Sequence, residues 1–161
     1  MIKDFFTKYR SYILSSLIAL AVGALSALLT MENMNLSHLK QPPLSPPAFL
    51  FPIVWSILYI LMGVSSAQIF SARKNSPEPV RNALSTYASS LVVNFAWSII
   101  FFNFGAFFLA FLWIILLKFL VIKTIKQYFL INKSAARLQI PYAVWVAFAG
   151  YLTLAISILN K

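Results

Sequence analysis

The sequence predicts an all-α integral membrane protein in which five transmembrane helices form one bundle, with a proline-rich lid loop between the first two helices. Two observations support this fold class. Of 161 residues, 61% are hydrophobic and 10% are charged, against about 45–50% apolar and about 25% charged in a soluble domain. So little polar sequence cannot cover a folded monomer in water, so lipid must be the solvent for much of its surface. The apolar residues also gather in stretches of membrane-spanning length.

The first two spans follow from the length that a transmembrane helix needs. About 20 apolar residues, each with a rise of about 1.5 Å, cross a hydrocarbon core of about 30 Å. Residues 11–31 and 49–71 meet this requirement. Pro52 is compatible with the second span, because a proline in the first helical turn loses an amide hydrogen that has no partner there anyway. No cleavage site follows the first span, so we interpret it as a membrane helix and not as a signal peptide.

A single charge-free stretch contains the third and fourth spans. Residues 82–117 carry no charge, and one helix of that length would measure about 54 Å, which is too long for one crossing. Asn103, Phe104 and Gly105 lie near its middle. Because Asn and Gly favour turns, we expect a hairpin there. The last three spans are therefore residues 82–102, 105–122 and 140–159. Since no linker or internal repeat is present, residues 1–161 are expected to form one domain.

The basic residues predict how the spans are oriented. Five crossings place the N-terminus and the segments near 72–81 and 123–139 at one face of the membrane. Ten basic residues lie at this face, namely Lys3, Lys8, Arg10, Arg73, Lys74, Arg81, Lys123, Lys126, Lys133 and Arg137. Only Lys40 and Lys161 lie at the other face. Because basic loops stay on the cytoplasmic side, we predict an inside N-terminus, with the 31–48 loop and the C-terminus outside.

This charge bias and the lack of a cleavable leader favour the cytoplasmic membrane. Insertion and contact with anionic membrane lipid account for the net charge of +10. We therefore expect no nucleic-acid partner.

The sequence gives little support for a conventional catalytic site or a metal site. The chain has no cysteine and a single histidine, His38, and its acids Asp4, Glu32 and Glu78 all lie outside the spans. No carboxylate pair, Ser-His-acid set or metal cluster can be assembled from these residues. We interpret His38 as a solvated loop residue. Without an ionisable group inside the spans, ion-coupled transport is not indicated either.

The segment between the first two spans is unusually rich in proline. Residues 42–52 contain five prolines, including two Pro-Pro pairs. Such pairs disfavour helix and favour extended polyproline geometry, so we expect a stiff, shaped loop that acts as a lid. The alternative is that these prolines only end one helix and begin the next.

Small residues within the first two spans indicate close helix packing. Ala19, Gly23 and Ala27 follow each other at intervals of four residues, and so do Gly63 and Ala67. Small residues at this spacing let helix backbones approach closely. The sequence leaves open whether they do so inside the bundle or between subunits.

Polar and indole-bearing residues recur inside three of the spans. They are Trp55, Ser56 and Tyr59; Asn94, Trp97 and Ser98; and Tyr142, Trp145 and Tyr151. Spacings of three and four residues put three sets of side chains on one face of their helix, namely Trp55 with Tyr59, Asn94 with Trp97 and Ser98, and Tyr142 with Trp145. Because an unpartnered polar group is costly in hydrocarbon, we expect these faces to line a cavity for a flat, largely apolar ligand. The alternative is that they form interfacial aromatic belts and helix-to-helix hydrogen bonds.

Taken in order, these residues resemble the TspO/translocator protein family, also called the peripheral-type benzodiazepine receptor family. The resemblance covers nearly the whole chain. Its motifs are Pro42-x-x-x-Pro46-Pro47, Phe51-Pro52-x-Val54-Trp55-x-x-Leu58-Tyr59-x-x-Met62-Gly63, Asn94-x-x-Trp97-Ser98-x-x-Phe101-Phe102, Pro141-Tyr142-x-x-Trp145-x-x-Phe148-Ala149 and the terminal Asn160.

The resemblance implies a five-helix bundle, usually a homodimer, with a ligand pocket open toward the proline-rich loop. Members bind porphyrins such as protoporphyrin IX, as sensors, carriers or scavengers, and many bind isoquinoline carboxamide or benzodiazepine drugs. Protoporphyrin IX would be a ligand or substrate, and no other cofactor or metal is implied. By motif position, the ligand-binding residues would be Pro42, Pro46, Pro47, Phe51, Trp55, Tyr59, Asn94, Trp97, Ser98, Phe101, Trp145 and Ala149.

The resemblance also implies an alternative, enzymatic function. Some bacterial members promote light- and oxygen-dependent breakdown of the porphyrin, and the pocket tryptophans are implicated. The catalytic residues would then be Trp55 and Trp145.

This sequence departs from the family pattern at several positions. Asn35 and Leu36 stand where a Trp-Tyr pair is common, Gln41 replaces a basic residue, and Leu44 replaces an aromatic one. Such changes would loosen the lid or weaken contact with porphyrin carboxylates, although Lys40 is close enough in sequence to substitute. Thr153 replaces a usual asparagine. No basic residue follows Tyr151 in the place where the animal sterol motif has one, which argues against sterol binding.

Overall fold

The computed structural model describes residues 2–161, with side chains described from Tyr9 onward. Within this range the chain is helical, with no strand, as the sequence predicts. The long helices are α1 (Ile2–Thr30), α2 (Leu50–Ser71), α3 (Pro77–Ser98), α4 (Phe107–Ile131) and α6 (Ile140–Leu159). Shorter pieces are the 3-10 turns Met31–Asn33 and Ala72–Lys74, the π-helical turn Ile99–Asn103 and helix α5 (Lys133–Leu138).

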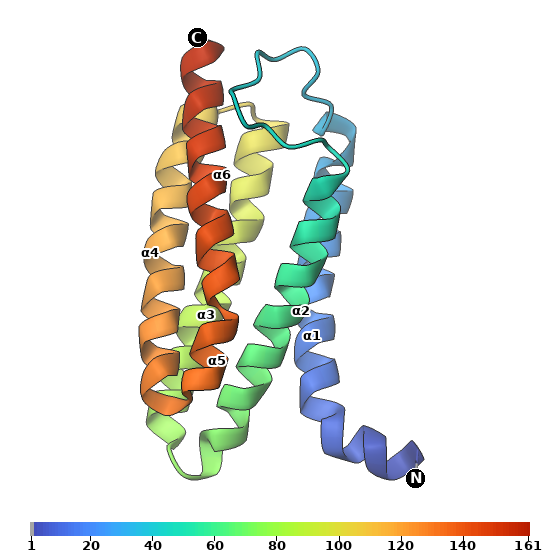
Figure 1. The fold of residues 1–161 in the computed structure, drawn as a ribbon, viewed down its shortest axis with the longest axis vertical. Coiled ribbons are helices and arrows are strands. Elements are labelled where there is room, and N and C mark those ends of the chain that lie inside the picture. Colours follow the sequence, from blue (N-terminus) through green and yellow to red (C-terminus); the bar gives the residue numbers. More distant parts are fainter. Residues whose placement is uncertain (1) are drawn as a thin grey trace.

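The five long helices run alongside one another as one bundle (Figure 1). Among the described residues, five helices are long and apolar enough to cross a membrane. The predicted class, an all-α protein with five membrane-length spans, is therefore confirmed.

The helices extend further than the charge-free stretches that predicted them. Helix α3 begins at Pro77, and α4 continues to Ile131 through a segment expected to be loop. That segment ends in the short helix α5, so the expected loop near 123–139 is largely helical. Long basic side chains explain the difference, because Lys123 and Lys126 can reach the aqueous boundary while their backbone continues the helix. Charged residues in the sequence indicate where the hydrocarbon core ends, but they do not indicate where the helix ends.

The hairpin between α3 and α4 lies where the sequence predicts it. Gly105 has φ of 58°, a left-handed conformation that glycine adopts without strain. The preceding Asn103 donates a hydrogen bond from Nδ2 to the Leu29 carbonyl at 2.9 Å and accepts one from Asn33 Nδ2 at 3.1 Å. Asn103 thus joins this hairpin to the end of α1, a role that turn preference alone does not predict.

Most of the small residues of α1 and α2 pack inside the bundle, whereas Ala27 is exposed. A Cβ atom added to Gly63 would collide with the α1 backbone at Ser15 and Ser16, and one added to Gly23 would collide with the ring of Tyr59. Ala19 and Ala67 are fully buried. The question that the sequence left open is settled for these positions, because the close contacts lie within one chain.

The two ends of the bundle differ in charge. The N-terminus, the α2–α3 connection and α5 lie at one end, and the C-terminus and the proline-rich loop lie at the other (Figure 1). The basic residues from Arg73 to Arg81 and from Lys123 to Arg137 belong to the first end, and Lys40 and Lys161 to the second. The side chains of Lys3 and Lys8 lie outside the described part. Which end faces the cytoplasm stays a prediction.

Candidate aromatic site and its proline-rich loop

Aromatic rings from α2 and α6 form a continuous cluster between these two helices. We call Phe51, Trp55, Tyr59, Tyr142 and Trp145 the aromatic cluster. The Trp55 ring stacks on Tyr59 with centroids 5.5 Å apart, and meets Tyr142 at 6.2 Å and Trp145 at 6.4 Å edge to face. Phe51 contacts Trp145 at 5.9 Å. The shared helix faces predicted from spacing thus converge on Trp55.

Helix α3 joins this cluster through one hydrogen bond. Asn94 Nδ2 donates to the Tyr59 hydroxyl at 2.9 Å, and the Asn94 side chain is 1% exposed. One turn later, Trp97 stacks on Phe101 with centroids 5.3 Å apart. Two predicted site residues on α3, Asn94 and Trp97, and Phe101 in the following π-helical turn therefore lie in the buried interior, and Asn94 connects α3 to α2.

Several polar atoms around these rings are buried without a hydrogen-bond partner. Among the described side chains they include Asn94 Oδ1, Trp97 Nε1, Tyr142 OH and Trp145 Nε1. An unsatisfied buried polar group costs about 1–3 kcal/mol, and most buried polar groups in native proteins are paired. Tyr142 and Trp145 belong to the aromatic cluster and Asn94 bonds to it, so three of these atoms are free to take a further hydrogen bond there.

Hydrogen bonds hold the proline-rich loop to α6. The Asn160 side chain accepts from the Lys40 amide at 2.9 Å and donates to the Lys40 carbonyl at 3.1 Å. The Tyr151 hydroxyl donates to the Pro43 carbonyl at 2.9 Å. Leu36 and Leu39 pack against the hydrophobic core. The loop is therefore fixed over one end of the bundle, as a lid would be.

The loop is not one extended polyproline segment. It turns at Pro43–Leu44 and again at Ala48–Phe49, and Leu44 has φ of 67°. The extended geometry that the Pro-Pro pairs favour is interrupted between them, because the single left-handed residue Leu44 reverses the chain locally. The Ser45 amide, which donates to the Pro42 carbonyl at 3.3 Å, closes this turn.

The remaining predicted site residues have looser relations to the cluster. Pro42 is buried and Pro46 half-buried, whereas Pro47 is exposed. Within residues 9–161, no hydrogen bond or ring contact joins Pro46, Pro47 or Ser98 to the aromatic cluster. Ala149 is buried on α6 and accepts the Thr153 hydroxyl at 2.7 Å. Thr153, the residue in place of the family's asparagine, is thereby satisfied within its own helix.

Two contacts were not predicted from the spacing of residues in the sequence. Phe107, which follows the hairpin, packs its ring 5.1 Å from that of Phe101. Trp113 Nε1 donates to the Val93 carbonyl at 2.9 Å, so this tryptophan holds α4 against α3. Both lie in uniformly apolar sequence without a polar neighbour, so no local signal separates them from lipid-facing residues.

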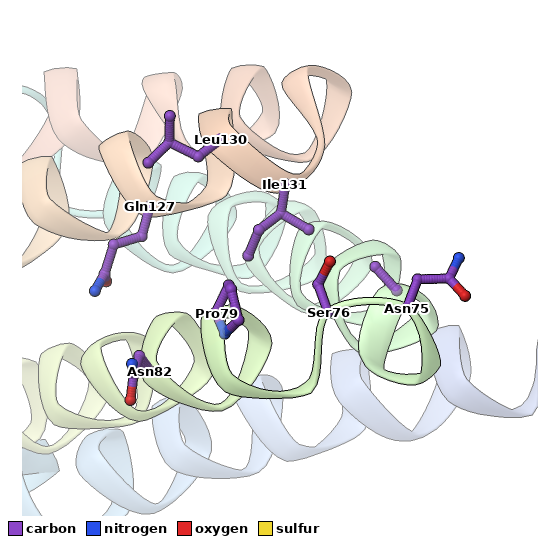
Figure 2. Close-up of a pocket in the computed structure, with 8 residues that line it drawn as sticks. Asn75, Ser76, Pro79, Asn82, Gln127, Leu130 and Ile131 are labelled. Carbon is purple, nitrogen blue, oxygen red and sulfur yellow. The ribbon is translucent and has the colours of Figure 1, made fainter.

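An apolar groove lies beside the aromatic cluster between α2 and α6. It has a volume of about 460 Å³ and is lined by Val54, Leu58, Val144 and Trp145, among others. Trp145 belongs both to the groove and to the cluster. A hollow of about 480 Å³ lies at the end of the bundle opposite the proline-rich loop. It is lined by residues of the α2–α3 connection, α3 and α4 (Figure 2).

These features define a helical integral membrane protein with a partly buried aromatic cluster between its spans and a proline-rich loop fixed over one end. Residues 15–159 match the family model of the TspO/MBR family. The chain belongs to this family.

Named relatives cover most of the chain. It is 32% identical over 145 residues to the tryptophan-rich protein TspO of Chlorobaculum tepidum, covering 89% of this chain and 91% of that protein. It is 31% identical over 116 residues to the translocator protein of Bos taurus, covering 72% and 69%. It is 27% identical over 123 residues to the tryptophan-rich sensory protein of Cereibacter sphaeroides, covering 76% and 75%.

Proposed function

We propose that this protein binds protoporphyrin IX, or a related flat apolar ligand, at the aromatic cluster, and acts as a membrane sensor, carrier or scavenger of porphyrins. Family membership supports the coarser role of a membrane translocator or sensor, since relatives are named translocator protein and tryptophan-rich sensory protein. The ligand itself is the finer part of the proposal. Drugs of the isoquinoline carboxamide and benzodiazepine type would bind at the same rings.

The observation that carries the proposal is the set of buried, unpartnered polar atoms among aromatic rings. Trp97 Nε1, Trp145 Nε1 and Tyr142 OH are donors, and Asn94 Oδ1 is an acceptor. A porphyrin offers both complements, because its carboxylates accept hydrogen bonds and its pyrrole N–H groups donate them. Its large π-face suits stacking on indole and phenol rings.

Binding requires the aromatic cluster to rearrange. Trp55 packs directly on Tyr59, Tyr142 and Trp145, so a ligand must separate these rings to lie between them. Access from the loop end requires the bonds from Asn160 and Tyr151 to open. The exposed Lys40 stands at that end, where its ammonium group could meet a ligand carboxylate.

A dark titration of the detergent-purified protein with protoporphyrin IX tests the proposal. We expect saturable quenching of tryptophan fluorescence, and about tenfold weaker binding in Trp145→Phe, which keeps a ring but loses the Nε1 donor. Trp113→Phe is the matched control, because Trp113 Nε1 is already satisfied by the Val93 carbonyl. Quenching that never saturates, or equal binding by all variants, would remove the aromatic cluster as the site.

A second candidate function is light- and oxygen-dependent porphyrin breakdown, in which Trp55 or Trp145 passes an electron or hydrogen to the photoexcited ligand. Its specific support is that Trp55 contacts three other oxidisable rings, two phenols and one indole. Absorbance of the illuminated complex would show a new product band. We expect the band to be lost in the Trp55→Phe, Trp145→Phe double variant and kept in Trp113→Phe. A band that persists without both tryptophans would contradict this mechanism.

A further inference from the structure

The hollow at the N-terminal end of the bundle differs from the aromatic cluster in place and in chemistry. Residues of α4 line one wall, and the α2–α3 connection with the first turns of α3 lines the other (Figure 2). Six of its residues are Ser76, Pro79, Asn82, Gln127, Leu130 and Ile131. We call it the α3–α4 hollow. Its volume of about 480 Å³ lies within the range of about 300–1,000 Å³ typical of ligand sites.

The walls of the α3–α4 hollow are half polar and half apolar. Gln127 on α4 and Asn82 on α3 bring amide groups to the same side of the opening (Figure 2). Leu130 and Ile131 provide an apolar wall, and the Leu130 side chain is 87% exposed. The hollow lies where the apolar spans end, so it meets both hydrocarbon and water. Such a site fits an amphiphile rather than a purely polar or purely apolar ligand.

One polar atom in this hollow lacks a partner. Within the described part of the chain, Gln127 Oε1 is buried without a hydrogen bond, so the Gln127 side chain must turn for a ligand to reach this atom. An amide oxygen accepts only, so the missing partner is a donor such as a hydroxyl group. The ligand therefore combines an apolar part with a polar part that carries O–H or N–H groups.

Basic residues stand close in sequence to the residues that line the hollow, and some of them have no carboxylate partner among the described side chains. Glu78, the acid nearest to it among the described side chains, is paired with Arg81 at 2.7 Å. Arg73 lies over the Phe70 ring at 3.9 Å and donates to the Phe70 carbonyl, so it is already engaged. Lys74 precedes the hollow residue Asn75 and has no carboxylate partner among the described side chains. Lys123 lies one helical turn before Gln127 on the same face of α4, also without such a partner.

From these three properties we propose that the α3–α4 hollow binds the headgroup of an anionic, hydroxyl-bearing phospholipid of the phosphatidylglycerol type. The phosphate lies between Lys74 and Lys123, and a headgroup hydroxyl donates to Gln127 Oε1. The acyl chains run along the exposed apolar surface that begins at Leu130. The site would couple the lipid composition of one leaflet to the packing of α3 against α4.

The first test compares lipids on the full chain in a neutral detergent. We expect dioleoylphosphatidylglycerol to raise the unfolding temperature saturably, because a ligand that binds only the native state stabilises it. Dioleoylphosphatidylcholine should have no such effect, and dioleoylphosphatidic acid, which lacks the headgroup hydroxyls, a smaller one. Native mass spectrometry counts the bound lipid. Equal stabilisation by all three lipids would overturn the proposal.

The second test uses variants with a matched control. Lys74→Gln with Lys123→Gln should weaken phosphatidylglycerol binding about 25-fold, since each basic residue near anionic lipid contributes about fivefold. Arg137→Gln removes the same charge at the same end, but on α5, which packs against α2 and α4, so it should change binding less than twofold. Gln127→Met with Asn82→Leu should abolish the preference for phosphatidylglycerol over phosphatidic acid. Wild-type binding in both double variants would place the lipid elsewhere.

A third arm separates a lipid from a soluble anion. Glycerol 1-phosphate carries the same headgroup chemistry without acyl chains, so we expect no stabilisation at the lipid's saturating concentration. Equal stabilisation would mean that the hollow takes a soluble phosphate ester, which contradicts the lipid assignment. The lysine double variant should retain wild-type quenching by protoporphyrin IX, so the two proposals can fail independently.

Discussion

At the residue scale, one buried hydrogen bond links α3 to the aromatic cluster. Asn94 on α3 reaches the Tyr59 hydroxyl on α2, and its own carbonyl oxygen stays unpartnered. In a low-dielectric interior such a bond is valuable mainly because breaking it leaves another polar group unsatisfied. Asn94 is thus held in place and still keeps an acceptor for a ligand.

We expect Tyr59→Phe to lower the free energy of unfolding by about 1–3 kcal/mol, because Asn94 Nδ2 then loses its only hydrogen-bond acceptor. Thermal unfolding in detergent measures the loss. Adding Asn94→Leu to Tyr59→Phe should cost less than the sum of the two single changes, since the partners form one pair. Strictly additive losses would show that the bond contributes nothing.

At the element scale, the two long helices nearest the N-terminus pack through glycine. The α1 backbone passes so close to Gly63 on α2 that no side chain fits between them. Gly150 on α6 is different, because an added Cβ atom would lie 3.5 Å from Ile114 Cγ2, an ordinary contact distance. Helix packing therefore requires glycine at position 63, whereas position 150 has room for a larger residue.

Gly63→Ala should destabilise the bundle by about 1–3 kcal/mol or prevent its folding, because α1 must move away from α2. Gly150→Ala is the control and should leave the unfolding temperature nearly unchanged. Both variants can be compared by thermal unfolding and by the yield of monodisperse protein. A Gly63→Ala protein as stable as wild type would mean that the helices are not this close in the membrane.

The proline-rich loop is the element whose position depends on contacts distant in sequence. Its bonds to Asn160 and Tyr151 join segments more than 100 residues apart. Proline content stiffens the loop locally, but these bonds fix it to α6. The lid interpretation therefore depends on α6 as much as on the prolines.

Asn160→Ala removes both hydrogen bonds to Lys40 and should speed tryptic cleavage after Lys40 several-fold, because the loop backbone is released. Ser56→Ala, which removes a bond to Pro52 within α2, is the control and should not alter cleavage. Limited proteolysis followed by mass spectrometry measures the rates. Unchanged cleavage in Asn160→Ala would contradict a loop held by α6.

At the scale of the whole molecule, charge and topology agree. The odd number of crossings puts the chain ends at opposite ends of the bundle (Figure 1), and the basic residues gather with the N-terminus. We propose that this end faces the cytoplasm and that the protein forms a homodimer, as its family resemblance implies. Light scattering of the purified protein would determine the number of subunits.

Orientation can be measured directly because the chain has no cysteine. In intact cells, a membrane-impermeant maleimide should label Ser37→Cys in the proline-rich loop and spare Ser134→Cys on α5. Both side chains are exposed, so exposure does not bias the comparison. After lysis, both should react. The reverse pattern in intact cells would invert the proposed topology.

The sequence by itself determined the span count, the hairpin near Gly105 and the helix faces of the aromatic residues. These depend on hydrophobic length and on a period of 3.6 residues, which are local properties. The sequence could not show that the helices extend past the charged residues at the ends of the spans, because long basic side chains let a helix continue beyond the hydrocarbon. Only the tertiary structure decided that Trp55 meets Trp145, that Asn94 reaches Tyr59, that Asn160 holds Lys40, and that the α3–α4 hollow opens with both polar and apolar walls. Each of these depends on which helices are neighbours and at what rotation, and no local pattern carries that information.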